Sequence, residues 1–418
     1  MAKMNKKKTN SKVQKNKKIY DISNIYRGFE ENIEAIRVFI ANLIPVAKKH
    51  DAVLKCRTDK VLNRFFKFVK THKIELKNRK DSEIMVSGKE NEKLFDILDQ
   101  LPSLSPKNTE LLYKSSFVTL ISYFDFIVSD LIHYFYQVYP QSLTNKQLSI
   151  SLSDLNSCAD ISDAVNYIVN KEVDNVLYDS LDKQLQYFQN ALKIDCKKDM
   201  INWEIIEEAI ARRNIIVHND SMVNKRYLAN INPSTLGKKM KEGSKISIQE
   251  NYFNIILNEI FIAGIILVQC CWRKWKKDGL EDADSMFIDS IYEMLKKEKW
   301  LEAEKLGKFA KDIDVYDASS RLCFNINYCQ SLKWQNKKNE LDKELERFDS
   351  STLSPKYVLA LAALKGDRES FYKNIEKAVT ADKMEINDFM EWPLFRELRR
   401  DHSYVGKVKR IIRRLKKK

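Results

Sequence analysis

Apolar residues recur at three- and four-residue steps along most of this chain, and that spacing limits its fold more than any other feature. Ile25, Phe29 and Ile33 follow it near the start of the sequence, and Val408 and Ile412 follow it near the end. This period gathers apolar side chains on one face of an α-helix, whereas a strand would alternate them. Only 9 Gly and 7 Pro occur in 418 residues. The sequence therefore predicts an all-α protein with short connections.

The same patterns predict how the chain is divided. A length of 418 residues allows two or three domains, and charge, apolar period and prolines mark the boundaries. We expect a disordered basic arm at 1–18, an N-terminal helical region at 19–106, a helical bundle at 107–278, helical repeats at 284–402 and a basic C-terminal tail at 403–418.

The bundle region contains four predicted helices. Its last helix includes the most membrane-like run of the chain, residues 252–272, but Asn254, Asn258 and Glu259 interrupt that run. We therefore expect a buried core helix and no membrane span. The four helices are expected at 110–139, at about 163–192, from residue 203, and at 251–275.

The region after the bundle is predicted to be a helical repeat. Helix-sized segments come in pairs, and the first of each pair begins near residues 284, 318 and 355. These steps are close to the roughly 34-residue period of tetratricopeptide repeats, although bulky residues stand where small ones are expected. Stacked repeats form surfaces that bind nucleic acid or a protein partner or inhibitor. The basic tail keeps a helical stripe, which could pack on the last repeat, bind nucleic acid or lie on a membrane surface.

Charge and cysteines narrow the choice of partner and compartment. A net charge of +15 favours a polyanion, with nucleic acid first. The seven cysteines are scattered, without a CxxC pair, which argues for reduced thiols and against structural zinc. The lysine-rich start of the chain has no apolar core of a secretory signal. We expect a cytoplasmic protein without a metal or cofactor, because no glycine-rich phosphate loop or carboxylate cluster occurs.

The stretch from Trp203 to Leu228, WEIIEEAIARRNIIVHNDSMVNKRYL, reads as one amphipathic helix that ends in a polar turn. A helical wheel places Arg213 in an apolar stripe, with Asn214 and His218 together on its flank and Arg212 on the opposite face. Desolvating a guanidinium costs several kcal/mol unless partners satisfy it. This arginine is therefore either half of a buried ion pair or part of a functional site. The apolar stripe comprises Ile206, Ala209, Ile210 and Val217.

The segment ARRNIIVHND resembles the R-x4-6-H signature of HEPN domains, and its surroundings are similar to the branch found in bacterial ribonuclease toxins and phage-defence proteins. YFDFIVSDLI, within the first bundle helix, resembles the first helix of that family. The resemblance covers the region 107–278, and its specific part is Glu207–Leu228. It implies a HEPN-type four-helix bundle that dimerises, with two motifs lining one cleft.

The motif residues suit RNA cleavage by the ribose 2′-hydroxyl. His218 can serve as general base or acid at neutral pH. Arg213 can clamp the phosphate and stabilise the transition state, and Asn214 can orient His218 or hold a phosphate oxygen. The expected products are a 2′,3′-cyclic phosphate and a 5′-hydroxyl, formed without a metal. Substrate-binding residues are expected to be Arg212, Lys225 and Arg226.

Two functions are therefore compatible with these residues. The first is a metal-independent endoribonuclease that acts as a toxin or anti-phage effector, as a homodimer through the motif helix. The second is a catalytically inactive scaffold of the same fold that binds RNA or protein. A purely structural repeat adaptor would leave Arg213 unexplained.

Overall fold

The computed structural model describes residues 19–71, 90–100, 107–144, 149–229, 231, 240–349 and 353–415. Over these residues the chain forms eighteen α-helices, three short 3-10 helices and no strand, with one isolated antiparallel bridge between Met222 and Lys245. The prediction of an all-α protein is confirmed. The basic arm expected at 1–18, and the last three residues of the expected tail, lie outside the described residues.

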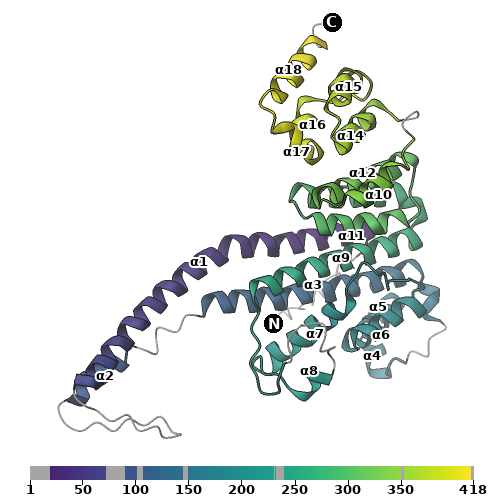
Figure 1. Ribbon diagram of the computed structural model, residues 1–418. Coiled ribbons are helices and arrows are strands. Elements are labelled where there is room, and N and C mark those ends of the chain that lie inside the picture. The colour runs from purple at the N-terminus through teal and green to yellow at the C-terminus, as the bar shows by residue number, and fades with distance from the viewer. Residues whose placement is uncertain are drawn as a thin grey trace, which may run out of the picture.

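The central layer consists of three long helices that pack against one another (Figure 1). They are α1 (Ile22–Thr71), α3 (Asn108–Val138) and α9 (Glu250–Trp275). The first half of α1 packs on the other two, and its second half runs away from the body to meet α2 (Glu90–Leu98). Two separate apolar segments in 19–106 thus lie on one 50-residue helix that continues through Pro45.

A glycine allows two of these helices to approach closely. Gly264 lies in the middle of α9, and a Cβ atom there would overlap the ring of Phe29 on α1. Phe29 is itself buried in the main core. The aromatic ring therefore lies directly on the α9 backbone, which the absence of a side chain at residue 264 permits.

Shorter helices lie on the opposite side of the central layer from the repeats (Figure 1). The stretch expected as one helix at 163–192 is two, because Asp179 and Ser180 interrupt it in extended conformation. The side chain of Asp160 caps the first of the two by accepting a hydrogen bond from Asp163 N. These helices are α4 (Leu152–Ser157), α5 (Ile161–Tyr178), α6 (Leu181–Asn190), α7 (Trp203–His218) and α8 (Lys225–Ala229).

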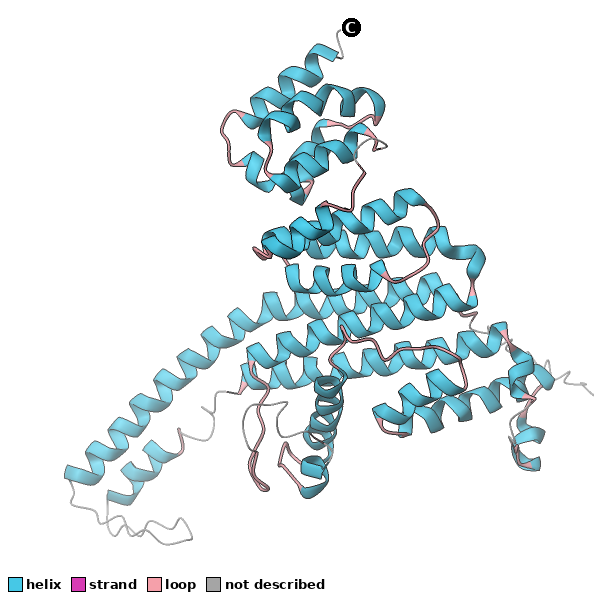
Figure 2. Cartoon of the chain, turned by 45° about the vertical axis from the view of Figure 1, so that its right-hand side comes forward, coloured by secondary structure: helices cyan, strands magenta, loops and turns pink. Residues whose placement is uncertain are grey.

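The C-terminal region contains three helical hairpins, with first helices close to the predicted starts at 284, 318 and 355 (Figure 2). The tail forms a helix, and Tyr404, Val408 and Ile412 bury it in the same core as the third hairpin. The hairpins are α10 (Leu280–Lys296) with α11 (Trp300–Lys311), α12 (Ala318–Trp334) with α13 (Lys338–Leu345), and α14 (Pro355–Lys365) with α15 (Arg368–Ala381); α16 (Ile386–Glu391), α17 (Arg396–Arg399) and α18 (Tyr404–Leu415) follow.

Two hydrophobic cores share the helix α12. The larger core runs from Ile22 to Phe324, and the second from Ile326 to Ile412. The larger core thus crosses the expected boundaries at residues 106 and 278. Two of its helices, α3 and α9, are long and apolar enough to cross a membrane by length and composition, and 83% of the most apolar window of α9 is buried inside the protein.

A buried carboxyl group joins α1 to α10. Ser290 donates a hydrogen bond to Glu30, and the hydroxyl groups of Tyr26 and Ser290 lie 2.6 Å apart. Burial raises the pKa of Glu30 to about 7. The folded state therefore holds this proton more tightly than the unfolded chain does, so its contribution to stability is complete below about pH 4.5 and disappears as the pH rises through 7.

We expect Glu30→Gln to flatten the pH dependence of stability. The pKa difference corresponds to about 3 kcal/mol that the wild type loses between pH 4.5 and 8. The melting temperature of the wild type should fall over this range, and that of Glu30→Gln should fall less. The exposed neighbour Glu31 provides the control substitution, Glu31→Gln. Equal slopes for Glu30→Gln and the wild type would show that Glu30 titrates normally.

Candidate active site

The buried face of α7 is rotated from the one that the helical wheel predicted, although Ile206 and Ala209 are buried as expected. Arg212 is only 4% exposed, whereas Val217, expected in the buried stripe, is 51% exposed. The prediction that Arg212 faces solvent or RNA is therefore wrong. Ile206, Ala209 and Ile215 share the buried face with Arg212.

A buried polar network explains this orientation. Glu208 lies four residues before Arg212, and its Oε1 accepts a hydrogen bond from Arg212 Nε at 2.8 Å. The hydroxyl groups of Tyr227 and Tyr252 also donate to Glu208, and the Arg212 guanidinium lies 3.8 Å from the centre of the Tyr252 ring. Both charges thus have partners inside the protein, which is the condition for burying them. The helical wheel was drawn from the apolar residues alone and therefore centred the buried face on Arg213.

Arg213 lies at the edge of a cleft and is not buried in the apolar stripe that the helical wheel predicted. Its side chain is 25% exposed, and Nη2 donates to Asp125 Oδ2 on α3 at 2.9 Å. Its Nε has no hydrogen-bond partner. Burial raises the pKa of Asp125 to about 6, although the charge of Arg213 acts in the opposite direction. The pair is therefore held together by charge at neutral pH and loses that charge as the pH falls below 6.

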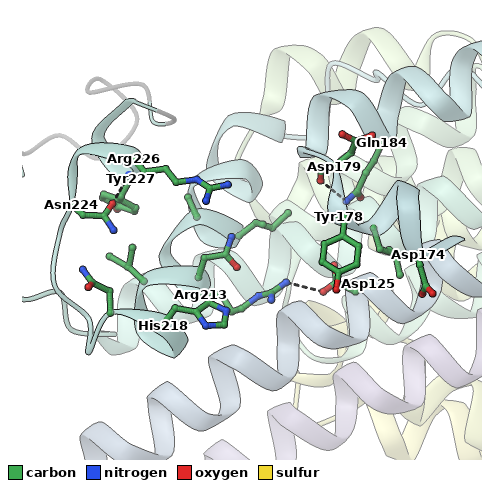
Figure 3. A pocket seen from close by; sticks show the side chains of 16 residues that line it. Asp125, Asp174, Tyr178, Asp179, Gln184, Arg213, His218, Asn224, Arg226 and Tyr227 are labelled. Carbon is green, nitrogen blue, oxygen red and sulfur yellow. Dashed lines mark hydrogen bonds and ion pairs between the residues drawn. The ribbon is translucent and has the colours of Figure 1, made fainter. Parts of the chain in front are cut away.

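The predicted motif residues meet in one open cleft of about 610 Å³. Arg213, Asn214 and His218 line it from α7, and Arg226 reaches it from α8 (Figure 3). His218 is the last residue of its helix and is exposed. No hydrogen bond joins Asn214 to His218 in the described structure, so the expected orienting contact is not formed. Lys225, although exposed, does not line the cleft.

The turn after α7 positions the other wall of the cleft. Asp220 and Ser221 both have positive φ, which reverses the chain directly after the helix. The side chain of Asn224 then accepts a hydrogen bond from Tyr227 N at 2.8 Å and begins α8. The hydroxyl group of Tyr227 also donates a hydrogen bond to Glu208. The buried network therefore fixes the position of α8, the helix that carries Arg226.

The charges of the cleft nearly balance. Asp125 is paired with Arg213, and Asp179 is paired with Lys183 at 2.8 Å. Arg226 forms no ion pair with any described residue, and Asp174 on α5 lines the same cleft. An arginine and an imidazole on an open surface can bind an anion and move a proton. Among the described residues, no group of three or more His, Cys, Asp or Glu side chains could hold a metal ion.

The sequence did not predict several of the cleft residues. Asp125 carried a signal, because it is a charge on a strongly apolar helix, but nothing in the sequence connected it with Arg213, 88 residues away. Asp174 and Tyr178 lie at the end of α5 and have no motif. Only the packing of α3 and α5 beside α7 brings them to the site.

No family model, curated protein or solved structure matches this chain. The resemblance to HEPN domains therefore rests on the motif residues of the sequence alone.

Proposed function

We propose that this protein is a metal-independent endoribonuclease of the HEPN type, acting in the cytoplasm as a toxin or anti-phage effector. The observation that carries the proposal is the convergence of Arg213, Asn214 and His218 on one open cleft. The net charge of +15 favours a polyanionic substrate such as RNA.

The proposed mechanism uses the 2′-hydroxyl of the RNA as the nucleophile. His218 takes the proton of this hydroxyl, or returns one to the departing 5′-oxygen. Arg213 donates to the non-bridging oxygens as negative charge develops on the phosphorane. The Asn214 amide can donate to the same oxygens, because His218 does not occupy it, and Arg226 contacts the neighbouring phosphate. Cleavage leaves a 2′,3′-cyclic phosphate and a 5′-hydroxyl.

A homodimer through α7 would supply the second proton carrier. One histidine cannot easily act on both sides of a phosphate, whereas two copies related by a two-fold axis can divide the roles. Two large apolar side chains stand exposed beside cleft residues. Val217, next to His218, is 51% exposed, and Phe126, next to Asp125, is 58% exposed. Burial of such side chains between two copies would stabilise the dimer.

A second candidate function is a non-catalytic scaffold that binds RNA or protein. The ion pair between Arg213 and Asp125 favours it, because the carboxylate already balances part of the charge that a phosphate would meet. The repeats would then provide the binding surface for a partner.

Incubating the purified protein with RNA in excess EDTA separates the two functions. The proposed enzyme should cut the RNA and leave 5′-hydroxyl ends that polynucleotide kinase can label without prior dephosphorylation. Sedimentation of the same preparation should show a dimer. Bound but intact RNA would instead support the scaffold.

We expect Asp125→Asn to slow cleavage by roughly one to two orders of magnitude, because Arg213 would lose the charge that fixes its position. Burial raises the pKa of Asp125 to about 6. Below that pH the carboxyl group of the wild type is protonated, so Asp125 should no longer hold Arg213 by its charge. The rate ratio of wild type to variant should therefore be large at pH 8 and smaller at pH 5.

Asp174→Asn is the matched control for this substitution. It removes a carboxylate from the same cleft without touching Arg213, so cleavage should be unchanged or faster. Similar losses in both variants would mean that Asp125 does not act by positioning Arg213.

A further inference from the structure

A second pocket lies between the helical hairpins, far along the chain from the cleft. Its volume is about 340 Å³, and α10, α12, α14 and α16 contribute side chains to it. Its walls carry four carboxylates and one lysine, Lys356. The pocket is therefore negatively charged, although the whole chain has a net charge of +15. The carboxylates are Asp289, Asp382, Asp388 and Glu391.

Two of these carboxylates have structural roles and two do not. Asp382 accepts a hydrogen bond from the backbone N of Lys356, and Asp388 accepts one from Glu385 N, each at 2.7 Å. Asp289 and Glu391 form no hydrogen bond or ion pair with any described residue. Both are exposed, so their charge is available to a ligand.

Two cations lie near the pocket and have other contacts. Lys296 pairs with Glu293 at 2.9 Å. The guanidinium of Arg399 donates to the carbonyl oxygens of Phe389 and Trp392. Lys296 thus pairs with a carboxylate outside the pocket, although its charge also acts on Glu391. The carbonyl contacts of Arg399 leave the charge of its guanidinium in place.

Aromatic rings complete the walls. Tyr292, Tyr357 and Trp392 line the pocket. The Nζ of Lys356 lies 5.7 Å from the ring centre of Tyr357 and 5.8 Å from that of Trp392. Rings in this arrangement attract a cation through their electron-rich faces. The pocket thus already holds one ammonium group against its aromatic side.

A side-chain amide in the same wall has no hydrogen-bond partner among the described residues. Asn327 on α12 is only 6% exposed, lines the pocket and forms no hydrogen bond with any described residue. Its amide atoms are not fully enclosed, so they are open to a group that enters the pocket. A ligand with a peptide backbone could supply both the donor and the acceptor that this amide needs.

We propose that this pocket binds a partner polypeptide by one lysine or arginine side chain, with Asp289 and Glu391 pairing with its charge and Asn327 hydrogen-bonding to the adjacent backbone. The site is separate from the proposed catalytic cleft and goes beyond the nuclease function. It gives the repeats a defined ligand chemistry, a cationic segment of a protein.

A fluorescein-labelled hexa-arginine peptide can test the proposal by fluorescence anisotropy with the full-length protein. A hexa-citrulline peptide, which has the same shape without the charge, should bind at least about tenfold more weakly. The double variant Asp289→Asn/Glu391→Gln should weaken binding of hexa-arginine by about tenfold or more. Asn327→Ala should weaken it as well, without changing the charge of the pocket.

The control is the double variant Glu340→Gln/Glu369→Gln, which removes the same charge from two exposed positions outside the pocket. It should bind hexa-arginine within about twofold of the wild type. Equal weakening by the two double variants would show general attraction to acidic groups and overturn the proposal. Equal affinity of the wild type for the citrulline peptide would also overturn it.

Discussion

Replacing His218 with Ala should reduce RNA cleavage by roughly a thousandfold while leaving RNA binding nearly unchanged. The proposed mechanism removes a proton from the 2′-hydroxyl through this imidazole, and a positioned general base or acid contributes on the order of 10²- to 10⁴-fold. His218 is exposed at the end of α7 and forms no contact that the fold requires. The loss should therefore appear in the single-turnover rate, measured with protein in excess over a labelled RNA, and not in the melting temperature.

Two further variants make this result specific. Arg213→Lys should lose comparable activity, because an ammonium cannot reproduce the planar fork that meets two phosphate oxygens. His402→Ala, at an exposed position outside the cleft, should retain the rate of the wild type. Undiminished cleavage by His218→Ala would exclude this imidazole from the chemistry and would favour the scaffold function.

The largest effect on stability is expected at Glu208. Glu208→Ala would leave the charge of Arg212 buried without its partner, together with two tyrosine hydroxyl groups. Breaking a buried pair in this way costs about 3–5 kcal/mol. The midpoint of urea unfolding should therefore fall well below that of the wild type. Tyr227 would also lose its hydrogen bond to Glu208, so α8 and Arg226 should shift. We therefore expect the rate of cleavage to fall together with the stability.

A rescue experiment distinguishes lost charge pairing from lost packing. The double variant Glu208→Leu/Arg212→Met removes both charges, so it should be more stable than Glu208→Ala. Glu207→Ala, at the preceding position and without an ion-pair partner, should change the free energy of unfolding by less than about 0.5 kcal/mol. If Glu208→Ala were as mild as Glu207→Ala, the buried network would contribute little to the fold.

Much of the architecture could be predicted from local patterns. The three- and four-residue apolar period located α3, α7 and α9 and the first helices of the three hairpins, because helices follow from local spacing and from the rarity of Gly and Pro. The points at which helices begin and end were predicted less well. The two segments of the N-terminal region lie on one helix, since Pro45 does not interrupt it, and the stretch at 163–192 is two.

The candidate site could likewise be predicted only in part. The spacing of Arg213, Asn214 and His218 on one helix was enough to expect them on neighbouring surface, and they line one cleft. Their environment was not predictable. The sequence gives no measure of which polar side chains find partners at a distance, and Asp125, Tyr227 and Tyr252 come from other helices.

The sequence by itself determined that the chain is helical, where most helices lie, and which motif residues fall together. The tertiary structure alone decided which of two adjacent arginines is buried. Arg212 is inside because Glu208 and two tyrosine hydroxyl groups satisfy its burial, and Arg213 is therefore turned toward the cleft and Asp125. A helix of this sequence could rotate either way. The hydrogen bonds available from its neighbours select the orientation, and they exist only once the helices have packed.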